Sequence, residues 1–186
     1  VLVCSAGVPG ESLPTAEVDF TDAVGWQLGE AKDGFHHLMN YILNASRIHN
    51  AAAALGLVHR AWLEAKNYAE QRIAFGRPII EFPMVKATLD AIEKDHAAKK
   101  ALYFSLLAQL DTHGWLPSDR EQRWWQRFLL NLMKYRTAVS ATEQVKEAIL
   151  ILGANGIIED FTILPRLLRD ALIVEIESRL HSCYRA

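Results

Sequence analysis

Three residues whose types could serve a ligand site stand close together after a long helical pattern: Arg72, Phe75 and Gly76. An arginine in the last turn of a helix complements the helix dipole. Gly76 can end that helix, and Pro78 keeps it from restarting. Spacing alone therefore explains this group as a helix stop, so a binding role for Arg72 requires support from the rest of the chain.

A second candidate group is the turn at residues 152–156, which reads Leu-Gly-Ala-Asn-Gly. It follows a helical pattern, so Gly153 and Gly156 can supply the positive φ that ends a helix. A third candidate is Glu177, which stands with Glu175 near the end of the last helical pattern. Such a carboxylate can act as a general base if it faces an apolar cavity. Otherwise it is a solvated surface residue.

The seven histidines show no metal-ligand spacing, because none stands three or four residues from another. One Glu-x-x-His pair occurs, formed by Glu93 and His96. A di-iron carboxylate bundle needs two such pairs and two further glutamates. We therefore expect no metal site.

Arginines and tryptophans are concentrated in one short run: Arg120, Arg123, Trp124, Trp125 and Arg127. Acidic residues interrupt this run, and the chain has a formal net charge of −2. A general nucleic-acid-binding protein is normally basic. A helix with one core face and one arginine face explains the run, and we expect no nucleic-acid partner.

The composition is that of a globular protein, with 186 residues of which 51% are hydrophobic and 23% charged. This length fits one domain with a sizeable core. No apolar run reaches the roughly 20 residues that a membrane-spanning helix needs. The two cysteines, Cys4 and Cys183, lie near opposite ends and favour the cytoplasm or another reducing compartment. The first ten residues lack the basic region of a signal peptide.

Apolar residues recur with a period near 3.6 through most of the chain, which is typical of amphipathic helices. Together with the breakers, they predict helices at 35–72, 84–113, 118–152 and 164–176. Ser118 with Glu121 forms a capping-box pattern at the start of the third helix. Long helices joined by short links favour antiparallel neighbours, so the sequence predicts an all-α, up-and-down four-helix bundle.

Two smaller features complete the predicted architecture. The small residues Ala51–Gly56 form a waist at which another helix can approach the first one closely. Before residue 30, only Val1–Cys4 and Ala16–Phe20 have a β-like pattern. We therefore expect a short irregular or β N-terminal segment in front of the bundle.

Taken in order, these motifs resemble the C-terminal half of the acyl-CoA dehydrogenase family. The resemblance covers roughly residues 16–178. The matching stretches are Glu17–Phe20, Ser46-Arg47 followed by Ala51–Gly56, Tyr68–Ile79, Leu152–Gly156 and Arg169–Ala171. The resemblance implies a remnant of a β domain with a linker at 1–30, a C-terminal helical bundle at 31–178 and a tail at 179–186.

The resemblance also implies a function. Enzymes of this family hold FAD and oxidise an acyl-CoA thioester to its trans-2-enoyl form, using a glutamate to remove the α-proton and the flavin to accept the β-hydrogen as hydride. They assemble as homodimers or homotetramers and pass electrons to an acceptor. The residues that match the family's sites are Glu177 as the base, Arg47 at the substrate, and Arg72, Phe75, Gly153, Ala154 and Asn155 at FAD, where Arg72 and Phe75 would touch the FAD of a neighbouring subunit.

The chain departs from the family pattern near its proposed base. The run Ile176-Glu177-Ser178-Arg179 has neither the aromatic residue nor the glycine that commonly flank the glutamate. Glu177 therefore aligns with the family's catalytic glutamate only if this chain has one residue deleted relative to the family pattern. Glu175 remains an alternative base. Some members place the base just before the arginine of the first long helix, where this chain has Ser46.

Other departures concern the cofactor. Leu150 stands where glutamine is common, and Ala154 replaces the second glycine of the turn. The chain also lacks the family's N-terminal helical domain and most of its β domain. We therefore expect the isolated chain to bind FAD weakly or not at all and to be inactive. The alternative hypothesis is a non-catalytic helical oligomerisation module.

Overall fold

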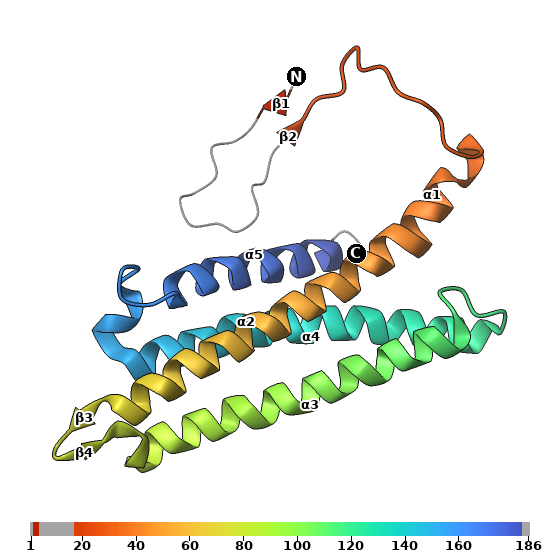
Figure 1. Ribbon diagram of the computed structural model, residues 1–186. Helices are drawn as coiled ribbons and strands as arrows, with labels where there is room; N and C mark the ends of the chain where they lie inside the picture. The colour runs from red at the N-terminus through yellow and green to blue at the C-terminus, as the bar shows by residue number, and fades with distance from the viewer. Residues whose placement is uncertain (1, 4–16, 184–186) are drawn as a thin grey trace.

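The computed structural model describes the backbone of residues 2–3 and 17–183 and the side chains of residues 19–178. Four long helices dominate it, as Figure 1 shows: α2 Leu43–Gln71, α3 Pro83–His113, α4 Arg120–Leu152 and α5 Leu164–Cys183. The 3₁₀ turn Ala31–Asp33, α1 Gly34–His37 and the π-helical turn Leu38–Ile42 lead into α2. The predicted helix at 35–72 is thus continuous apart from one π turn. The predicted four-helix architecture is confirmed.

The N-terminal segment contains the predicted short β structure. Strand β1 Leu2–Val3 pairs antiparallel with β2 Glu17–Val18, with Leu2 opposite Val18. Both strands fall within the predicted β-like pieces. Cys4 lies outside the described residues, as do the side chain of Cys183 and residues 184–186, so the cysteine-based inference about the compartment stays a prediction.

Two predicted helix boundaries are wrong. Helix α4 is capped by Asp119 rather than Ser118, because the Asp119 carboxylate accepts a hydrogen bond of 2.9 Å from the Gln122 backbone N–H. A carboxylate at this position also complements the helix dipole. Helix α5 continues seven residues beyond the predicted end at 176. Ser178 does not interrupt it, because its hydroxyl donates 2.8 Å back to the Val174 carbonyl.

Small residues let α2 and α4 pack closely at the centre of the bundle. The inward face of α2 carries five buried alanines: Ala51, Ala54, Ala61, Ala65 and Ala69. The core-facing side of α4 carries the buried residues Ala138, Ala141, Val145 and Ala148. Leucine and isoleucine side chains of α3 and α5 close this core at its sides: Leu89, Ile92, Leu164 and Leu167. Of the predicted waist, Ala51 and Ala54 belong to this alanine face, whereas Gly56 is exposed with nothing within 4 Å of a Cβ placed there.

A small β-hairpin, which the sequence analysis did not predict, joins α2 to α3. Strand β3 Ile73–Ala74 pairs with β4 Arg77–Pro78. The two residues between them, Phe75 and Gly76, have φ values of 53° and 82°. Two consecutive positive φ values are those of a type I′ turn, in which the first position is usually Asn, Asp or Gly. Phenylalanine is an uncommon residue there.

Candidate functional site

The hairpin holds Arg72 and Phe75 at one end of the bundle. The Arg72 backbone is fixed on both sides, because its N–H donates to the Tyr68 carbonyl and its carbonyl accepts from the Ile79 N–H, each at 2.9 Å. Its side chain is exposed. Phe75 is 97% exposed at the tip of the turn, and its ring meets Phe82 edge-on at 6.3 Å. The hairpin therefore presents a cation and an aromatic ring outward.

The turn that follows α4 lies at the same end. Gly153 has φ 61° and begins the 3₁₀ turn Gly153–Ile157. Gly156 is packed so closely that a Cβ atom there would lie 2.5 Å from the Ile149 carbonyl oxygen. The Asn155 amide donates 3.2 Å to the Tyr68 hydroxyl. The structure thus brings Arg72, Phe75 and the 153–155 turn to one end of the bundle, at the left of Figure 1.

Glu177 belongs to a second group, built by α2, α4 and α5. The Asn50 amide donates 3.1 Å to one carboxylate oxygen of Glu177. The Lys134 ammonium donates 3.5 Å to the Glu177 backbone carbonyl. Arg47 is 5% exposed and donates 2.7 Å to the side-chain oxygen of Asn44. Glu177 and Arg47, which the family resemblance assigned to base and substrate, therefore lie in one polar cluster.

Lys134 is the most unusual member of this cluster, because a lysine is rarely buried. It is 6% exposed. Burial lowers the pKa of Lys134, the negative charge of Glu177 partly offsets that effect, and the positive charge of Arg47 adds to it. Lys134 therefore lies within electrostatic reach of both Arg47 and the exposed Glu177.

The two groups are far apart within one chain. Arg47 lies near the start of α2 and Arg72 directly follows its end. At a rise of 1.5 Å per residue, this separation is roughly 37 Å along the helix axis. A single straight helix prevents the two arginines from meeting, so Arg72 and Glu177 of one chain cannot contact the same small molecule.

Two further observations concern the described part of the chain. Within the described part of the chain, no three His, Cys, Asp or Glu side chains gather in a way that could hold a metal ion. No helix in that part is long and apolar enough to span a bilayer.

The family of the chain is shown by a match over most of its length. Residues 32–178 match the family model described as acyl-CoA dehydrogenase, C-terminal domain. The chain belongs to the acyl-CoA dehydrogenase family. It is 32% identical over 166 residues to acyl-CoA dehydrogenase family member 11 of Caenorhabditis elegans, and 35% identical over 149 residues to the 3-(aryl)acrylate reductase of Clostridium sporogenes. These alignments cover 89% and 80% of this chain.

The fold agrees with this assignment. The chain resembles the structure of Caenorhabditis elegans ACDH-11 in complex with C11-CoA, with a TM-score of 0.73 and 31% identity. This match covers 81% of the chain and 25% of that structure. The chain likewise spans only 27% and 36% of the two curated relatives. It therefore carries the family's C-terminal helical domain.

Sequence reasoning missed three residues that this acyl-CoA dehydrogenase-like domain places around Glu177 and Arg47: Asn44, Asn50 and Lys134. A signal for Lys134 was present, because it lies four residues from both Leu130 and Ala138 on the core face of its helix. A lysine on an apolar stripe indicates a buried partner. Asn50 carried no such signal, since its contact with Glu177 spans 127 residues of sequence.

Proposed function

We propose that this chain is the C-terminal domain of a FAD-dependent enzyme that converts an acyl-CoA thioester into its trans-2-enoyl form. Family membership supports this reaction class. The observation that carries the proposal is the cluster around Glu177, an exposed carboxylate on α5 that lies near the buried Lys134 of α4, which in turn lies near the buried Arg47 of α2.

In this proposal Glu177 is the general base that takes the α-proton of the thioester. The 3.1 Å hydrogen bond from Asn50 holds its carboxylate in one orientation. A base of this kind typically contributes a factor of about 10² to 10⁴ in rate. The positive charges of Lys134 and Arg47 favour the negative charge that develops on the substrate as the proton leaves. Bound FAD supplies the acceptor for the β-hydride.

The test is Glu177→Gln in the full-length, flavin-loaded protein. We expect turnover to fall by about 10³-fold or more while flavin stays bound, because the amide keeps the shape but cannot accept the proton. Glu175→Gln is the matched control, since it changes the alternative base two residues away on the same helix. Unchanged turnover in Glu177→Gln with loss in Glu175→Gln would transfer the role to Glu175. Unchanged turnover in both would reject a base on α5.

The residues at the hairpin end fit a flavin dinucleotide. Arg72 is an exposed cation, and none of the ion pairs between described side chains involves it. A guanidinium pairs well with pyrophosphate oxygens. Phe75 offers an almost fully exposed ring, and the Gly153–Asn155 turn lies at the same end of the bundle. We assign these residues, including Ala154, to FAD binding.

The distance between the two groups determines how such a site is assembled. Because Arg72 lies roughly 37 Å from Arg47 along one helix, the FAD that Arg72 contacts serves the Glu177 of another copy. We therefore propose a homodimer or homotetramer whose sites are shared between subunits.

Exposed apolar side chains on several helices are consistent with such an assembly, among them Phe104, Trp124, Trp125, Phe128 and Leu150. The same surfaces would serve the alternative, an oligomerisation module without catalysis. The Glu177→Gln experiment separates the two functions, because a module without catalysis has no turnover to lose. We further propose that the full-length protein passes its electrons to an acceptor and works in the cytoplasm or another reducing compartment.

A further inference from the structure

A hollow of about 280 Å³ lies between α2 and α3, at residues that the proposed function does not use. Helix α2 contributes small and apolar residues, among them Gly56, together with the imidazole of His59. Helix α3 contributes a second imidazole, an ammonium, a phenol and a phenyl ring, from His96, Lys100, Tyr103 and Phe104. The lining therefore combines aromatic faces with polar groups that can donate hydrogen bonds, and it contains no carboxylate.

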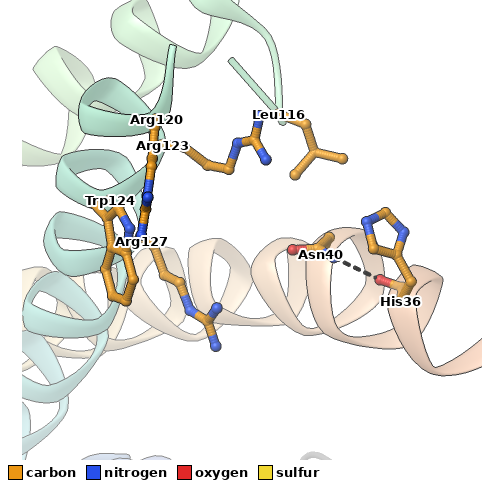
Figure 2. A pocket seen from close by; sticks show the side chains of 7 residues that line it. All are labelled: His36, Asn40, Leu116, Arg120, Arg123, Trp124 and Arg127. Carbon is orange, nitrogen blue, oxygen red and sulfur yellow. Dashed lines mark hydrogen bonds between the residues drawn. The ribbon is translucent and has the colours of Figure 1, made fainter. Parts of the chain in front are cut away.

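The cation of this hollow is not engaged elsewhere, unlike part of the arginine-lined hollow at the start of α4 that Figure 2 shows. There Arg123 already has a structural role, because its Nε and Nη2 donate to the Pro117 carbonyl at 3.0 and 2.9 Å. Lys100 is exposed and takes part in none of the ion pairs between described side chains. Its ammonium is therefore available to an anionic ligand.

The two histidines form a stacked pair across the contact between α2 and α3. Their ring centroids are 5.4 Å apart and their planes meet at 20°. The Nδ1 atom of His96 is buried and has no hydrogen-bond partner among the described residues. A neutral imidazole carries its proton on one nitrogen only, and a buried N–H without an acceptor is costly. The proton of neutral His96 therefore belongs on Nε2, which gives the hollow an N–H donor.

Positive charge predominates around this donor. Burial lowers the pKa of His96, and the charges of His59, Lys100 and Lys99 lower it further, whereas Asp95 opposes them. The Asp95 carboxylate also accepts hydrogen bonds from two side chains of α4, so it is engaged on the other side of α3. An anion in the hollow would therefore lower the repulsion among these groups.

We propose that the hollow between α2 and α3 binds a small carboxylate with an aromatic body. The carboxylate pairs with the Lys100 ammonium and accepts a hydrogen bond from His96 Nε2. The aromatic body packs against Phe104, which is 60% exposed and meets the Tyr103 ring edge-on at 5.5 Å. The volume is just below the roughly 300–1,000 Å³ of pockets for drug-sized ligands, so it suits a compact molecule. This inference does not depend on the proposed function.

The test is calorimetry on the full-length protein with phenylacetate as the probe. Two analogues separate its parts: 2-phenylethanol keeps the ring without the charge, and acetate keeps the charge without the ring. We expect both to bind about tenfold more weakly than phenylacetate, because each loses one of the two sets of contacts. A wild-type protein that binds no phenylacetate would overturn the assignment. Equal binding of acetate and phenylacetate would overturn the aromatic part of it.

Two variants locate the site. Lys100→Ala should weaken phenylacetate binding about tenfold, whereas the control Lys94→Ala, which removes an exposed lysine of α3 outside the hollow, should not change it. Gly56→Leu should abolish binding without harming the fold, because a Cβ there meets nothing within 4 Å and leucine is a better helix former than glycine. Phenylacetate binding that both Lys100→Ala and Gly56→Leu retain would contradict the proposal.

Two further measurements exclude other occupants. Glu177→Gln should bind phenylacetate as the wild type does; if it loses binding while Lys100→Ala retains it, the probe occupies the site around Glu177 and the assignment to the hollow fails. The effect of Gly56→Leu on turnover and on light scattering is the second. If the wild type binds no probe and Gly56→Leu changes the oligomeric state, the hollow receives a second copy of the chain, which also overturns the proposal.

Discussion

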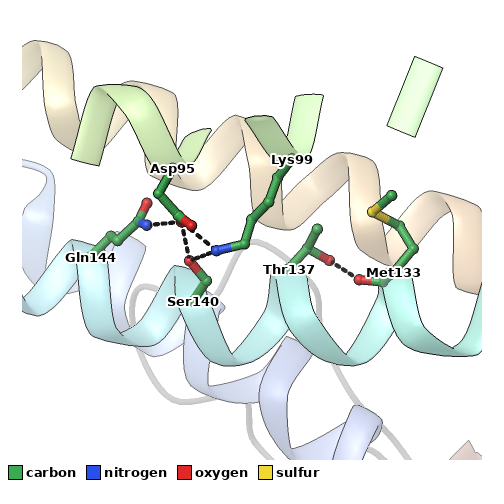
Figure 3. A network of polar contacts seen from close by, with 6 residues as sticks. All are labelled: Asp95, Lys99, Met133, Thr137, Ser140 and Gln144. Atoms are coloured by element: carbon green, nitrogen blue, oxygen red, sulfur yellow. Dashed lines mark hydrogen bonds and ion pairs between the residues drawn. The ribbon is translucent and has the colours of Figure 1, made fainter. Parts of the chain in front are cut away.

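A polar network between α3 and α4 gives the stability prediction that the structure defines best. Figure 3 shows the Asp95 carboxylate accepting hydrogen bonds from Lys99, Ser140 and Gln144. The bond from the Ser140 hydroxyl is 2.9 Å long. Lys99 also donates 2.6 Å to the Ser140 hydroxyl, and its side chain is 15% exposed. Replacing Asp95 therefore leaves a largely buried ammonium without its carboxylate.

We expect Asp95→Ala to lower the free energy of unfolding by about 2 kcal/mol. A hydrogen bond to a charged group contributes about 1.5–3 kcal/mol. The loss is smaller than the sum of three such bonds, because the Asp95 side chain is 41% exposed and solvent screens its charge. For a chain of this length, 2 kcal/mol corresponds to roughly 4–8 °C in Tm. Urea unfolding measures it as a shift in midpoint at constant slope.

The pH dependence of the same variant has a definite sign. Burial raises the pKa of Asp95, but the hydrogen bonds from Lys99, Ser140 and Gln144 outweigh it and hold this pKa below its ordinary value of 3.8. A carboxylate with a lowered folded-state pKa stabilises the fold above its unfolded pKa and loses that contribution as the pH falls through the folded one. The stability difference between wild type and Asp95→Ala should therefore be full at neutral pH and shrink below about pH 4.

Asp90→Ala is the matched control, since Asp90 also pairs with a lysine one turn away on α3. That pair, with Lys86, is 3.6 Å apart with both side chains more than two-fifths exposed. Exposed pairs of this kind contribute about 0.5 kcal/mol or less. If Asp90→Ala and Asp95→Ala destabilise the chain equally, the network adds nothing beyond a surface ion pair and the reasoning fails.

Two further predictions concern the hairpin and the glycine turn. Arg72→Ala should weaken FAD retention about fivefold in the full-length protein, since one exposed ion pair contributes only about 1 kcal/mol. For the same reason, the purified 186-residue chain should show no flavin absorbance even with Arg72 present. A yellow isolated chain would contradict this. Gly156→Ala should lower the free energy of unfolding by about 1–3 kcal/mol, because its Cβ would lie 2.5 Å from the Ile149 carbonyl. Gly56→Ala, in a helix with open space around it, should be neutral or stabilising in the same thermal scan.

The helices could be predicted because their signals are local. A period of 3.6 and the breakers Pro83, Gly114 and Gly153 depend only on neighbouring residues. Gly76, which we expected to end the first helix, lies instead in the hairpin turn, because α2 already ends at Gln71. The structure ends α3 at Gly114 with φ 74° and α4 at Gly153 with φ 61°. Errors arose where two local signals competed, as at residues 118 and 119, where aspartate rather than serine caps the helix.

The polar clusters could not be predicted, because they depend on how the helices are rotated against one another. Periodicity identifies the buried face of each helix but not which residue meets which. Asn50, Lys134 and Glu177 come from three helices, and the Asp95 network joins residues 45 and 49 positions apart. The hairpin escaped prediction for a different reason, since its turn places a phenylalanine at positive φ where Asn, Asp or Gly is usual.

The length of α2 makes the shared site testable by complementation. If Arg72 of one subunit serves the Glu177 of another, Arg72→Ala and Glu177→Gln homo-oligomers each carry a defect in every site. In a mixed dimer of the two variants, one site combines both defects and the other has none. Co-expression with two different tags, followed by tandem purification and assay at an FAD concentration that leaves most Arg72→Ala sites empty, should therefore recover up to half of the wild-type turnover per dimer. If Arg72 instead served the Glu177 of its own chain, mixing would restore nothing beyond the average of the two variants. The uninterrupted helix between Arg47 and Arg72 predicts the first outcome, because roughly 37 Å cannot be closed within one chain without breaking the α2 backbone ladder.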